Sequence, residues 1–441
     1  MIPAETDAEF ITAHGSSTRT AARRDAYRTS LLVGLGGLFA GVTGPLLSTF
    51  VPILVRDALG EQRTAIGAVM AIDNVLLLVL VPWAGILSDR AVNRGRSRLP
   101  LVLLGYLLAA IGMAIFPLSA ALGIAGIVGA IVVLYAGLNV QRSPFQALVA
   151  DAVPSRYRSL ATASVMFQMC VGAIVFLMLG RALGMERAFL VAAATVLVIG
   201  VAFALGLGRR GQTPSSLARN PTPATETTWR SLAGAGASVA RGAIPGLRAI
   251  FLASLLLQMV FQSFATWFAL HGTERFGVRA EDVTIGFIAW AIGGVIGALP
   301  AGLIGVRFGR RTAMVVGFAL MAACFAALDR VATLSVAVPL LALASACWTL
   351  PQVNAYPLFI EPIPRAERGV LASLYLLAMA LGGMVGDPFN GVVFDLLDGY
   401  RALFLLMAGY AALAALAVLL VPRGTGEAAT GPDRAPAAAA P

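Results

Sequence analysis

The sequence predicts an all-α membrane protein with twelve transmembrane helices arranged as two six-helix halves. Three observations predict this fold class. The 441-residue chain is 59% hydrophobic and only 12% charged, with a mean hydropathy of +0.85, a composition outside the usual range of soluble domains. Apolar stretches of about 20 residues or more recur from Ser30 to Val421, each long enough to cross a hydrocarbon core of about 30 Å. The two halves of the chain also carry matching motifs.

The apolar runs and the charged residues that interrupt them define the spans. In chain order the predicted spans are 30–55, 64–87, 99–119, 121–150, 159–180, 187–208, 248–271, 284–306, 312–329, 332–358, 370–394 and 401–421. A stretch rich in Pro, Ser, Thr and Gly separates the sixth span from the seventh, and we interpret it as a flexible cytoplasmic linker. The predicted units are therefore a cytoplasmic tail (1–29), an N-terminal bundle (30–208), the linker (209–247), a C-terminal bundle (248–421) and a disordered cytoplasmic tail (422–441).

The distribution of arginine predicts the orientation. All 32 basic residues are arginine. Of these, 23 lie in the two tails, the linker and the loops that would share their side, whereas eight lie in the opposite loops. The positive-inside rule therefore places both termini in the cytoplasm. The arginine, alanine and glycine bias is typical of a GC-rich bacterial genome, so we expect a multi-pass protein of the bacterial cytoplasmic membrane.

Two motifs recur at equivalent span ends. "DAVPSRYR" after the fourth span, with Asp151 and Arg158, is matched 210 residues later by "EPIPRAER" after the tenth, with Glu361 and Arg368. Likewise "GILSDRAVNRGRSR" after the second span is echoed by "GLIGVRFGRR" after the eighth. In this second pair Gly85 matches Gly302 and Arg90 matches Arg307, while Asp89 has no counterpart. The two echoes indicate duplication of a six-helix unit.

The "GILSDRAVNRGR" motif in a six-plus-six chain resembles the loop signature of the major facilitator superfamily. The second and fourth spans, "MAIDNVLLLVLVPWAGILSDR" and "LNVQRSPFQALVADAVPSRYRSLATA", are also similar to the sucrose-transporter and glycoside-pentoside-hexuronide:cation symporter-like branch. The superfamily resemblance implies transport by rocking of the two halves around a site at the membrane midplane. It also implies a cytoplasmic gate of ion pairs and helix-dipole contacts. The gating residues expected from it are Gly85, Asp89, Arg90, Asp151, Arg158, Gly302, Arg307, Glu361 and Arg368.

Arginines in the second loop have two readings. Arg90, Arg94 and Arg96 are either gate partners or determinants of topology. For Arg94 and Arg98 we favour the topological reading, whereas the duplicated motif favours a gate role for Asp89 and Arg90.

Charged residues inside spans are the strongest functional candidates, because a charge in hydrocarbon costs at least about 2.5 kcal/mol. Asp73 and Arg142 lie near mid-depth of the second and fourth spans. We expect them to interact electrostatically, either as a static ion pair or as a coupling site in which Asp73 releases and rebinds a proton. Asp387 stands before Pro388 in the glycine-rich eleventh span, where we expect a break or kink. Asp387 either satisfies the backbone there or binds substrate.

Polar and aromatic side chains within the spans provide the expected substrate-binding groups. These are Asn74, Asn139, Gln141, Gln168, Gln258, Gln262, Trp290, Trp348, Gln352, Asn354 and Asp387. Tryptophan faces stack on pyranose rings, although tryptophans at span ends are more often interfacial anchors, the role expected of Trp267.

Several function classes are disfavoured by what the sequence lacks. Without lysine no P-loop is possible, so ATP does not drive the cycle. Two peripheral histidines and three scattered cysteines provide no metal site or catalytic cluster, so we expect no enzyme activity and no cofactor. Basic patches with interleaved aromatics are missing, so nucleic acid is not an expected partner.

The expected function is secondary active transport of a small polar solute by a monomer in the lipid bilayer. Proton-coupled import of a neutral sugar or glycoside is the first choice, with Asp73 and Arg142 as the ion-coupling residues. Proton-driven efflux of a drug-like or metabolite compound is the alternative. Sodium is the alternative coupling ion, since Asp73 and Asn74 offer adjacent oxygens. A membrane sensor or enzyme is a third, disfavoured class.

Overall fold

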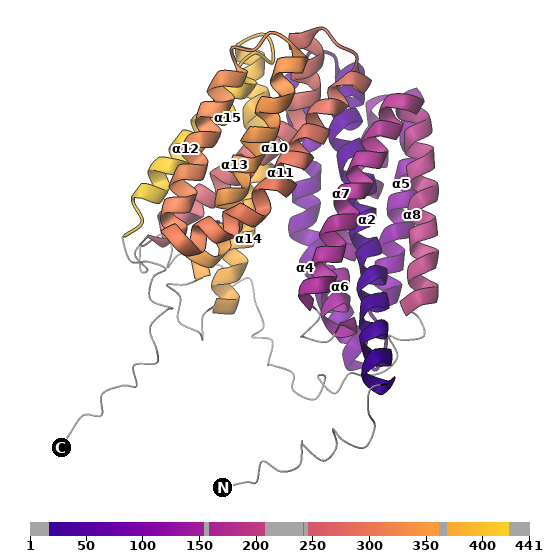
Figure 1. The fold of residues 1–441 in the computed structure, drawn as a ribbon. Coiled ribbons are helices and arrows are strands. Elements are labelled where there is room, and N and C mark those ends of the chain that lie inside the picture. Colours follow the sequence, from indigo (N-terminus) through magenta and orange to yellow (C-terminus); the bar gives the residue numbers. More distant parts are fainter. Residues whose placement is uncertain (1–16, 154–157, 208–240, 242–245, 361–367, 423–441) are drawn as a thin grey trace, which may run out of the picture.

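The computed structural model describes residues 17–153, 158–207, 241, 246–360 and 368–422. The described chain is helical apart from short turns, and it forms two bundles that stand side by side (Figure 1). The N-terminal half comprises α2 (Ser17–Leu59), α3 (Arg63–Met70), α4 (Ile72–Asn93), α5 (Leu99–Ser119), η1 (Ala120–Leu122), α6 (Gly123–Ala152), α7 (Arg158–Leu183) and α8 (Met185–Leu207). The C-terminal half comprises α10 (Leu247–Phe276), α11 (Ala280–Phe308), α12 (Arg310–Leu328), α13 (Leu334–Ile360), α14 (Arg368–Leu396) and α15 (Leu403–Leu419).

Every predicted span corresponds to helix in this structure. Among the described residues, ten segments are long and apolar enough to cross a membrane, and α15 is a shorter apolar helix. The segment Leu99–Val149 contains both α5 and α6, which accounts for the twelfth span. The prediction of an all-α protein with twelve apolar helices is therefore confirmed.

Three helices differ from their predicted spans. The first helix begins at Ser17, 13 residues before the predicted start, so part of the expected tail is helical. The second span is divided at Ala71 into α3 and α4, and the backbone of Ala71 stays right-handed helical (φ −69°, ψ −13°). No break occurs at Asp387, because α14 continues through Pro388 to Leu396. The expected break was therefore wrong, and its alternative, a kink, stays a prediction. The expected linker, 209–247, lies almost wholly outside the described residues.

Aromatic packing fills the interior of each half. In the N-terminal half Phe39 stacks on Tyr106 with ring centroids 4.3 Å apart, and in the C-terminal half Phe264 stacks on Trp290 at the same separation. Large apolar side chains such as Leu205 and Leu303 are more than 70% exposed on the outer surfaces. Such surfaces suit a hydrocarbon environment, since a soluble monomer rarely exposes them.

The two halves meet mainly on one side of the molecule. We name the side where α2 begins the terminal side and the side where α2 ends and α3 begins the far side (Figure 1). α3 and α4 pack on α14, α7 packs on α11, and α2 packs on α10 and α11. The hydrogen bonds and ion pairs that join Arg63 and Thr64 to α14 and its following loop, and Arg181 to Asp282, all lie toward the far side. The structure is therefore closed on the far side.

Candidate transport site

Asp73 lies in the first turn of α4 and is held by an amide from α6. Its carboxylate accepts a hydrogen bond of 2.9 Å from Asn139 Nδ2, which also donates to the backbone oxygen of Tyr135 at 3.0 Å. Arg142, one turn further along α6, is exposed and acts on Asp73 through space, without an ion-pair contact in the described structure. The expected electrostatic interaction is present, but the direct partner of Asp73 is Asn139.

Asp387 lies in the C-terminal half and is completely buried on α14. Two α10 side chains donate to its Oδ2, Gln262 from 3.0 Å and Thr266 from 3.1 Å. Gln262 and Thr266 are four residues apart and share one face of α10. The second carboxylate oxygen, Oδ1, has no hydrogen-bond partner among the described residues. The indole N–H of Trp267, also on α10, acts on the carboxyl as a third neutral donor without meeting hydrogen-bond geometry, so the donors around Asp387 are all neutral.

A polar chain beside Asp387 escaped the sequence analysis. Asn390, one turn after Asp387 on α14, donates to Ser263 Oγ of α10 at 2.7 Å. Tyr410 of α15 donates to Asn390 Oδ1, also at 2.7 Å. Serine and tyrosine in apolar spans are too common to single out, and only the packing of α10, α14 and α15 reveals that these groups pair.

The two acids flank one contact between the halves. Asn74, adjacent to Asp73, is 5% exposed and lies against Gly383 of α14, one helical turn before Asp387. On the same contact, Gly67 of α3 lies so close to the backbone oxygen of Asp387 that a Cβ atom could not fit. Asp73 and Asp387 also act on each other electrostatically. Three of the residues predicted from separate spans, Asp73, Asn74 and Asp387, therefore lie around one contact between the halves.

An aromatic cluster lies within the C-terminal half, where α10, α11 and α13 meet. Trp290 of α11 stacks on Phe264, and Trp348 of α13 stacks on Phe261 with centroids 5.5 Å apart. Trp348 is half-buried, and its Nε1 donor has no partner among the described residues. The Oε1 acceptor of Gln352, one turn later on α13, has no partner among them either. Unused polar atoms beside aromatic faces suit a ligand with both hydroxyls and apolar ring faces.

The remaining amides lie elsewhere. Gln141 packs against Gly105 of α5 inside the N-terminal bundle, and Asn354 donates to the backbone oxygens of Ala301 and Leu350. Neither contributes to the contact between the acids. Gln258 lies beside Gly382 at the α10–α14 contact.

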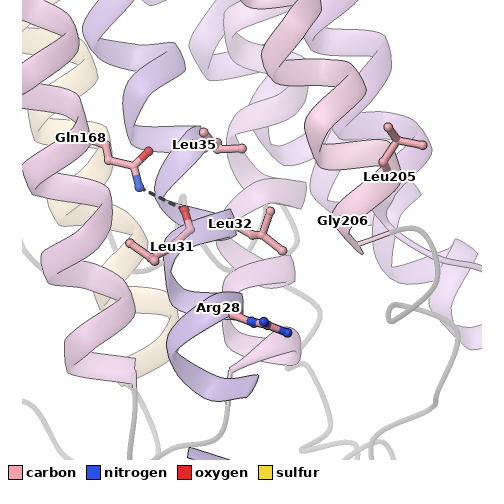
Figure 2. Close-up of a pocket in the computed structure, with 7 residues that line it drawn as sticks. All are labelled: Arg28, Leu31, Leu32, Leu35, Gln168, Leu205 and Gly206. Carbon is pink, nitrogen blue, oxygen red and sulfur yellow. Dashed lines mark hydrogen bonds between the residues drawn. The ribbon is translucent and has the colours of Figure 1, made fainter. Parts of the chain in front are cut away.

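Gln168 of α7 lines a pocket on the terminal side, at the ends of α2, α7 and α8 (Figure 2). Its Nε2 donates to the backbone oxygen of Leu31 at 3.0 Å. The pocket has a volume of about 710 Å³, and Arg28 is its only charged lining residue among those described. It lies within the N-terminal half, so Gln168 is not part of the site between the halves.

Trp267 is another departure from expectation. It was expected at the membrane interface, but it is fully buried between Phe394 and Tyr400. The interfacial prediction was wrong because the far-side loop folds over the end of α10.

On the terminal side, Arg98 joins the ends of three helices. It donates to Asp89 at 2.5 Å, to Asp151 at 2.9 Å and to Ser88 at 2.8 Å. Burial acts to lower the pKa of the Arg98 guanidinium, but the hydrogen bonds to Asp89 and Asp151 outweigh it and the pKa is raised. From the sequence, a topological role was favoured for Arg98. In the structure Arg98 is the partner of two of the three expected gate acids, Asp89 and Asp151, and all three of these residues belong to the N-terminal half.

Other expected gate residues form fewer contacts. Gly85 lies near Ser143 of α6, Gly302 has open space around it, and Arg90 is exposed. Arg307 is exposed and lies over the Phe308 ring. Arg158 and Arg368 begin α7 and α14, but their side chains lie outside the described part, as does Glu361.

The far side carries a cluster that no sequence motif indicated. The backbone N–H groups of Arg63 and Thr64, at the start of α3, donate to the Asp395 carboxylate of α14 at 2.9 and 2.8 Å. The Arg63 guanidinium pairs with Asp398 at 3.3 Å and lies over the Tyr400 ring. We name Arg63, Thr64, Asp395 and Asp398 the far-side gate. An acid at a helix N-terminus is favourable, because it satisfies free N–H groups and complements the helix dipole.

Comparison with known proteins identifies the family. The Major Facilitator Superfamily profile matches residues 29–297 and 273–441, which together span most of the chain. The chain belongs to the major facilitator superfamily. It is therefore a membrane transporter rather than an enzyme. The magnetosome protein MamH of Paramagnetospirillum magneticum (strain ATCC 700264 / AMB-1) is 27% identical over 417 residues, covering 88% of this chain and 92% of that protein.

Solved structures share the fold of this superfamily member at low sequence identity. The nucleoside transporter NupG has a TM-score of 0.69 at 14% identity, covering 89% of this chain and 98% of that one. The D-xylose-proton symporter has a TM-score of 0.66 at 16% identity, covering 90% and 98%. A bacterial homologue of the human lysosomal transporter Spinster, in an inward-facing and unoccupied conformation, has a TM-score of 0.65 at 15% identity, covering 92% and 98%.

Proposed function

We propose that this transporter imports a neutral sugar or glycoside together with a proton, and that Asp73 is the coupling group. The observation that carries the proposal is the position of Asp73, an acid within a membrane-spanning segment whose direct partner is a neutral amide, Asn139. Such a carboxylate can change protonation without breaking an ion pair.

A sugar-like solute is supported by the aromatic cluster of the C-terminal half. Trp290 and Trp348 offer aromatic faces, and the free polar atoms of Trp348 and Gln352 can receive and donate to hydroxyls. Among structures of the same fold, one is a D-xylose-proton symporter. The sequence similarity of the second and fourth spans to the sucrose-transporter and glycoside-type branch favours the same class. We further propose that both termini are cytoplasmic and that the membrane is the bacterial cytoplasmic membrane.

Substrate-dependent alkalinisation tests the proposal. Cells that express the protein are given each member of a sugar and glycoside panel while the external pH is recorded. We expect alkalinisation with one class of sugar, because proton and solute enter together. Export of a dye without alkalinisation would instead support the alternative, proton-driven efflux.

Asp73→Asn separates coupling from binding. An amide cannot release a proton, so we expect this variant to lose accumulation against a gradient while exchange of labelled solute across the membrane continues. The matched control is Asp57→Asn, an acid-to-amide change at an exposed residue paired with Arg56, which should leave accumulation unchanged. Uphill uptake at the wild-type level in Asp73→Asn would remove this residue from the coupling role.

A further inference from the structure

Asp387 is a buried acid without a counter-charge. Its side chain is completely buried, its two hydrogen-bond donors are neutral, and one carboxylate oxygen has no hydrogen-bond partner among the described residues. An ionised carboxylate removed from water needs a cation or a strong set of donors, and otherwise becomes neutral. Neutral donors without a cation, namely Gln262, Thr266 and the indole of Trp267, leave the charged form of Asp387 poorly compensated in this closed state.

The titratable groups that face Asp387 do not supply a positive charge. They are Asp73 from α4, Tyr135 from α6 and Tyr410 from α15. Asp73 is itself an acid, and two like charges in a region of low dielectric disfavour each other. The neighbouring acid thus adds to the cost of ionising Asp387.

The other helices packed on α14 offer no cation either. α13 has no charged residue from Leu334 to Ile360. On α10, His271 faces away, with its Nδ1 2.9 Å from the backbone oxygen of Tyr400, and the remaining charged residues lie at the two ends of the helix. On α3, Arg63 is engaged in the far-side gate two helical turns beyond Asp387 along α14. Arg142 acts on Asp73 rather than on Asp387.

Asp387 is buried by the contact that closes the far side. Gly67 of α3 lies directly against its backbone, and Asn74 of α4 covers α14 one turn earlier. Opening the far side requires α3 and α4 to leave α14, which removes this cover. Closing the far side therefore moves Asp387 from a partly hydrated setting into a dry one, a step that costs far more for a charged carboxyl than for a neutral one.

We propose that Asp387 is a second proton site, located in the C-terminal half, whose protonation permits the far side to close. The proton adds to a carboxylate oxygen and the carboxyl becomes neutral. A proton fits better than a metal cation, because Gln262 and Thr266 present hydrogen-bond donors to Asp387, whereas a hard cation needs a shell of oxygen ligands. The proposal deepens the proposed function in that it adds a second proton to the coupled cycle, but its test requires no solute.

Spin labels across the far side measure closure directly. The labels are attached to Gln62→Cys and Leu397→Cys, which are exposed positions on opposite halves. They report the distance between the start of α3 and the α14–α15 loop. Cys170→Ser removes the partly exposed native cysteine. Reconstituted protein is examined by electron–electron resonance at a series of pH values with no solute present. If one proton is linked to closure, we expect the closed-to-open ratio to rise up to about tenfold for each unit that pH falls.

Substitutions assign this pH dependence to Asp387. Asp387→Asn should close equally at all pH values, within about twofold, because its side chain is always neutral. Thr266→Val removes one donor that favours the charged carboxylate, so it should keep the slope but close at a higher pH. This second variant keeps the test informative if Asp387→Asn folds poorly. Asp395→Asn is the matched acid-to-amide control on α14, and it should lower closure at every pH without changing the slope.

Each alternative outcome is distinct. The proposal is overturned if the closed-to-open ratio of Asp387→Asn depends on pH as steeply as in the wild type. It is also overturned if the pH dependence is lost in Asp73→Asn but kept in Asp387→Asn. Closure driven by sodium chloride at constant pH, with potassium chloride as the salt control, would replace the proton with sodium and overturn the assignment. Failure of sugar uptake leaves this measurement unaffected, so the proposed function and the second proton site fail separately.

Discussion

Arg98 shows how one side chain can organise the end of a bundle. It reaches the carboxylates of Asp89 and Asp151 and the hydroxyl of Ser88 at once. Its raised pKa keeps the guanidinium charged at every pH the protein can meet. The contribution of these contacts to folding stability is therefore complete below the ordinary arginine pKa, and it would be lost only as the pH rises through the raised pKa. The guanidinium is largely buried, whereas the two acids are half-exposed or more, so water screens part of each interaction.

Arg98→Gln should therefore destabilise the N-terminal half modestly. We expect a loss of about 1 kcal/mol in the free energy of unfolding, because hydrogen bonds to charged groups are strong but these are partly screened. Thermal unfolding in detergent micelles measures it. Arg90→Gln, a neighbouring exposed arginine, should have no measurable effect. Equal losses in the two variants would mean that Arg98 acts only through the net charge of the loop.

At the residue scale, the sequence identified unusual residue types but not their partners. Asp73 and Asp387 were found because acids are rare in apolar spans, and both lie at the contact between the halves. The partner of Asp73 could not be read from spacing, since Asn139 and Arg142 are one turn apart on α6 and only the packed helices decide between them. The pairing of Arg98 could not be predicted, because its loop contains four arginines and the pattern does not distinguish one from another.

At the scale of elements, the predicted spans agree with the helices to within a few residues in most cases. The span 99–119 coincides with α5, because Pro100 and charged residues mark its start clearly. The helix that begins at Ser17 could not be predicted, because hydropathy detects the part of a helix that lies in lipid and not its polar extension. The expected break at Pro388 failed because a helix in a bundle tolerates a proline when its neighbours satisfy the freed backbone group.

Gly67 allows α3 and α14 to approach closely, and its substitution tests that contact. Gly67→Ala would place a Cβ against the backbone oxygen of Asp387, which cannot move aside as a flexible side chain could. We expect the far side to favour its open state and transport to fall by about fivefold or more, since overpacking of this kind costs about 1–3 kcal/mol. Closure is measured with the labels on the far side, and uptake with the identified solute.

Gly129→Ala is the control for helix propensity. This glycine of α6 has open space around it, so a methyl group there meets no neighbour. We expect unchanged transport and slightly greater stability, because alanine favours a helix more than glycine does. Wild-type closure and uptake in Gly67→Ala would show that α3 can shift along α14 without loss, which the close backbone contact argues against.

At the scale of the whole molecule, the contacts of this conformation are uneven. The halves are joined at the far side by the far-side gate and by an ion pair of 3.0 Å between Arg181 and Asp282. On the terminal side, the polar contacts of Arg98 lie within the N-terminal half. The alternating-access cycle of the superfamily requires the reverse arrangement as well. The far-side contacts must therefore be strong enough to favour closure and weak enough to open in every cycle.

The two far-side connections should differ in strength. The Asp395 carboxylate accepts hydrogen bonds from two backbone N–H groups and from the Thr64 hydroxyl. Asp395→Ala removes all three of these charge-assisted hydrogen bonds at once. We expect the closed-to-open ratio to fall about 10- to 100-fold, which corresponds to about 1.5–3 kcal/mol. Arg181 is 51% exposed in its side chain, so Arg181→Ala should change the ratio by no more than about threefold. Spin-label distances at constant pH measure both variants. A larger effect of Arg181→Ala would place the main connection between α7 and α11 instead of between α3 and α14.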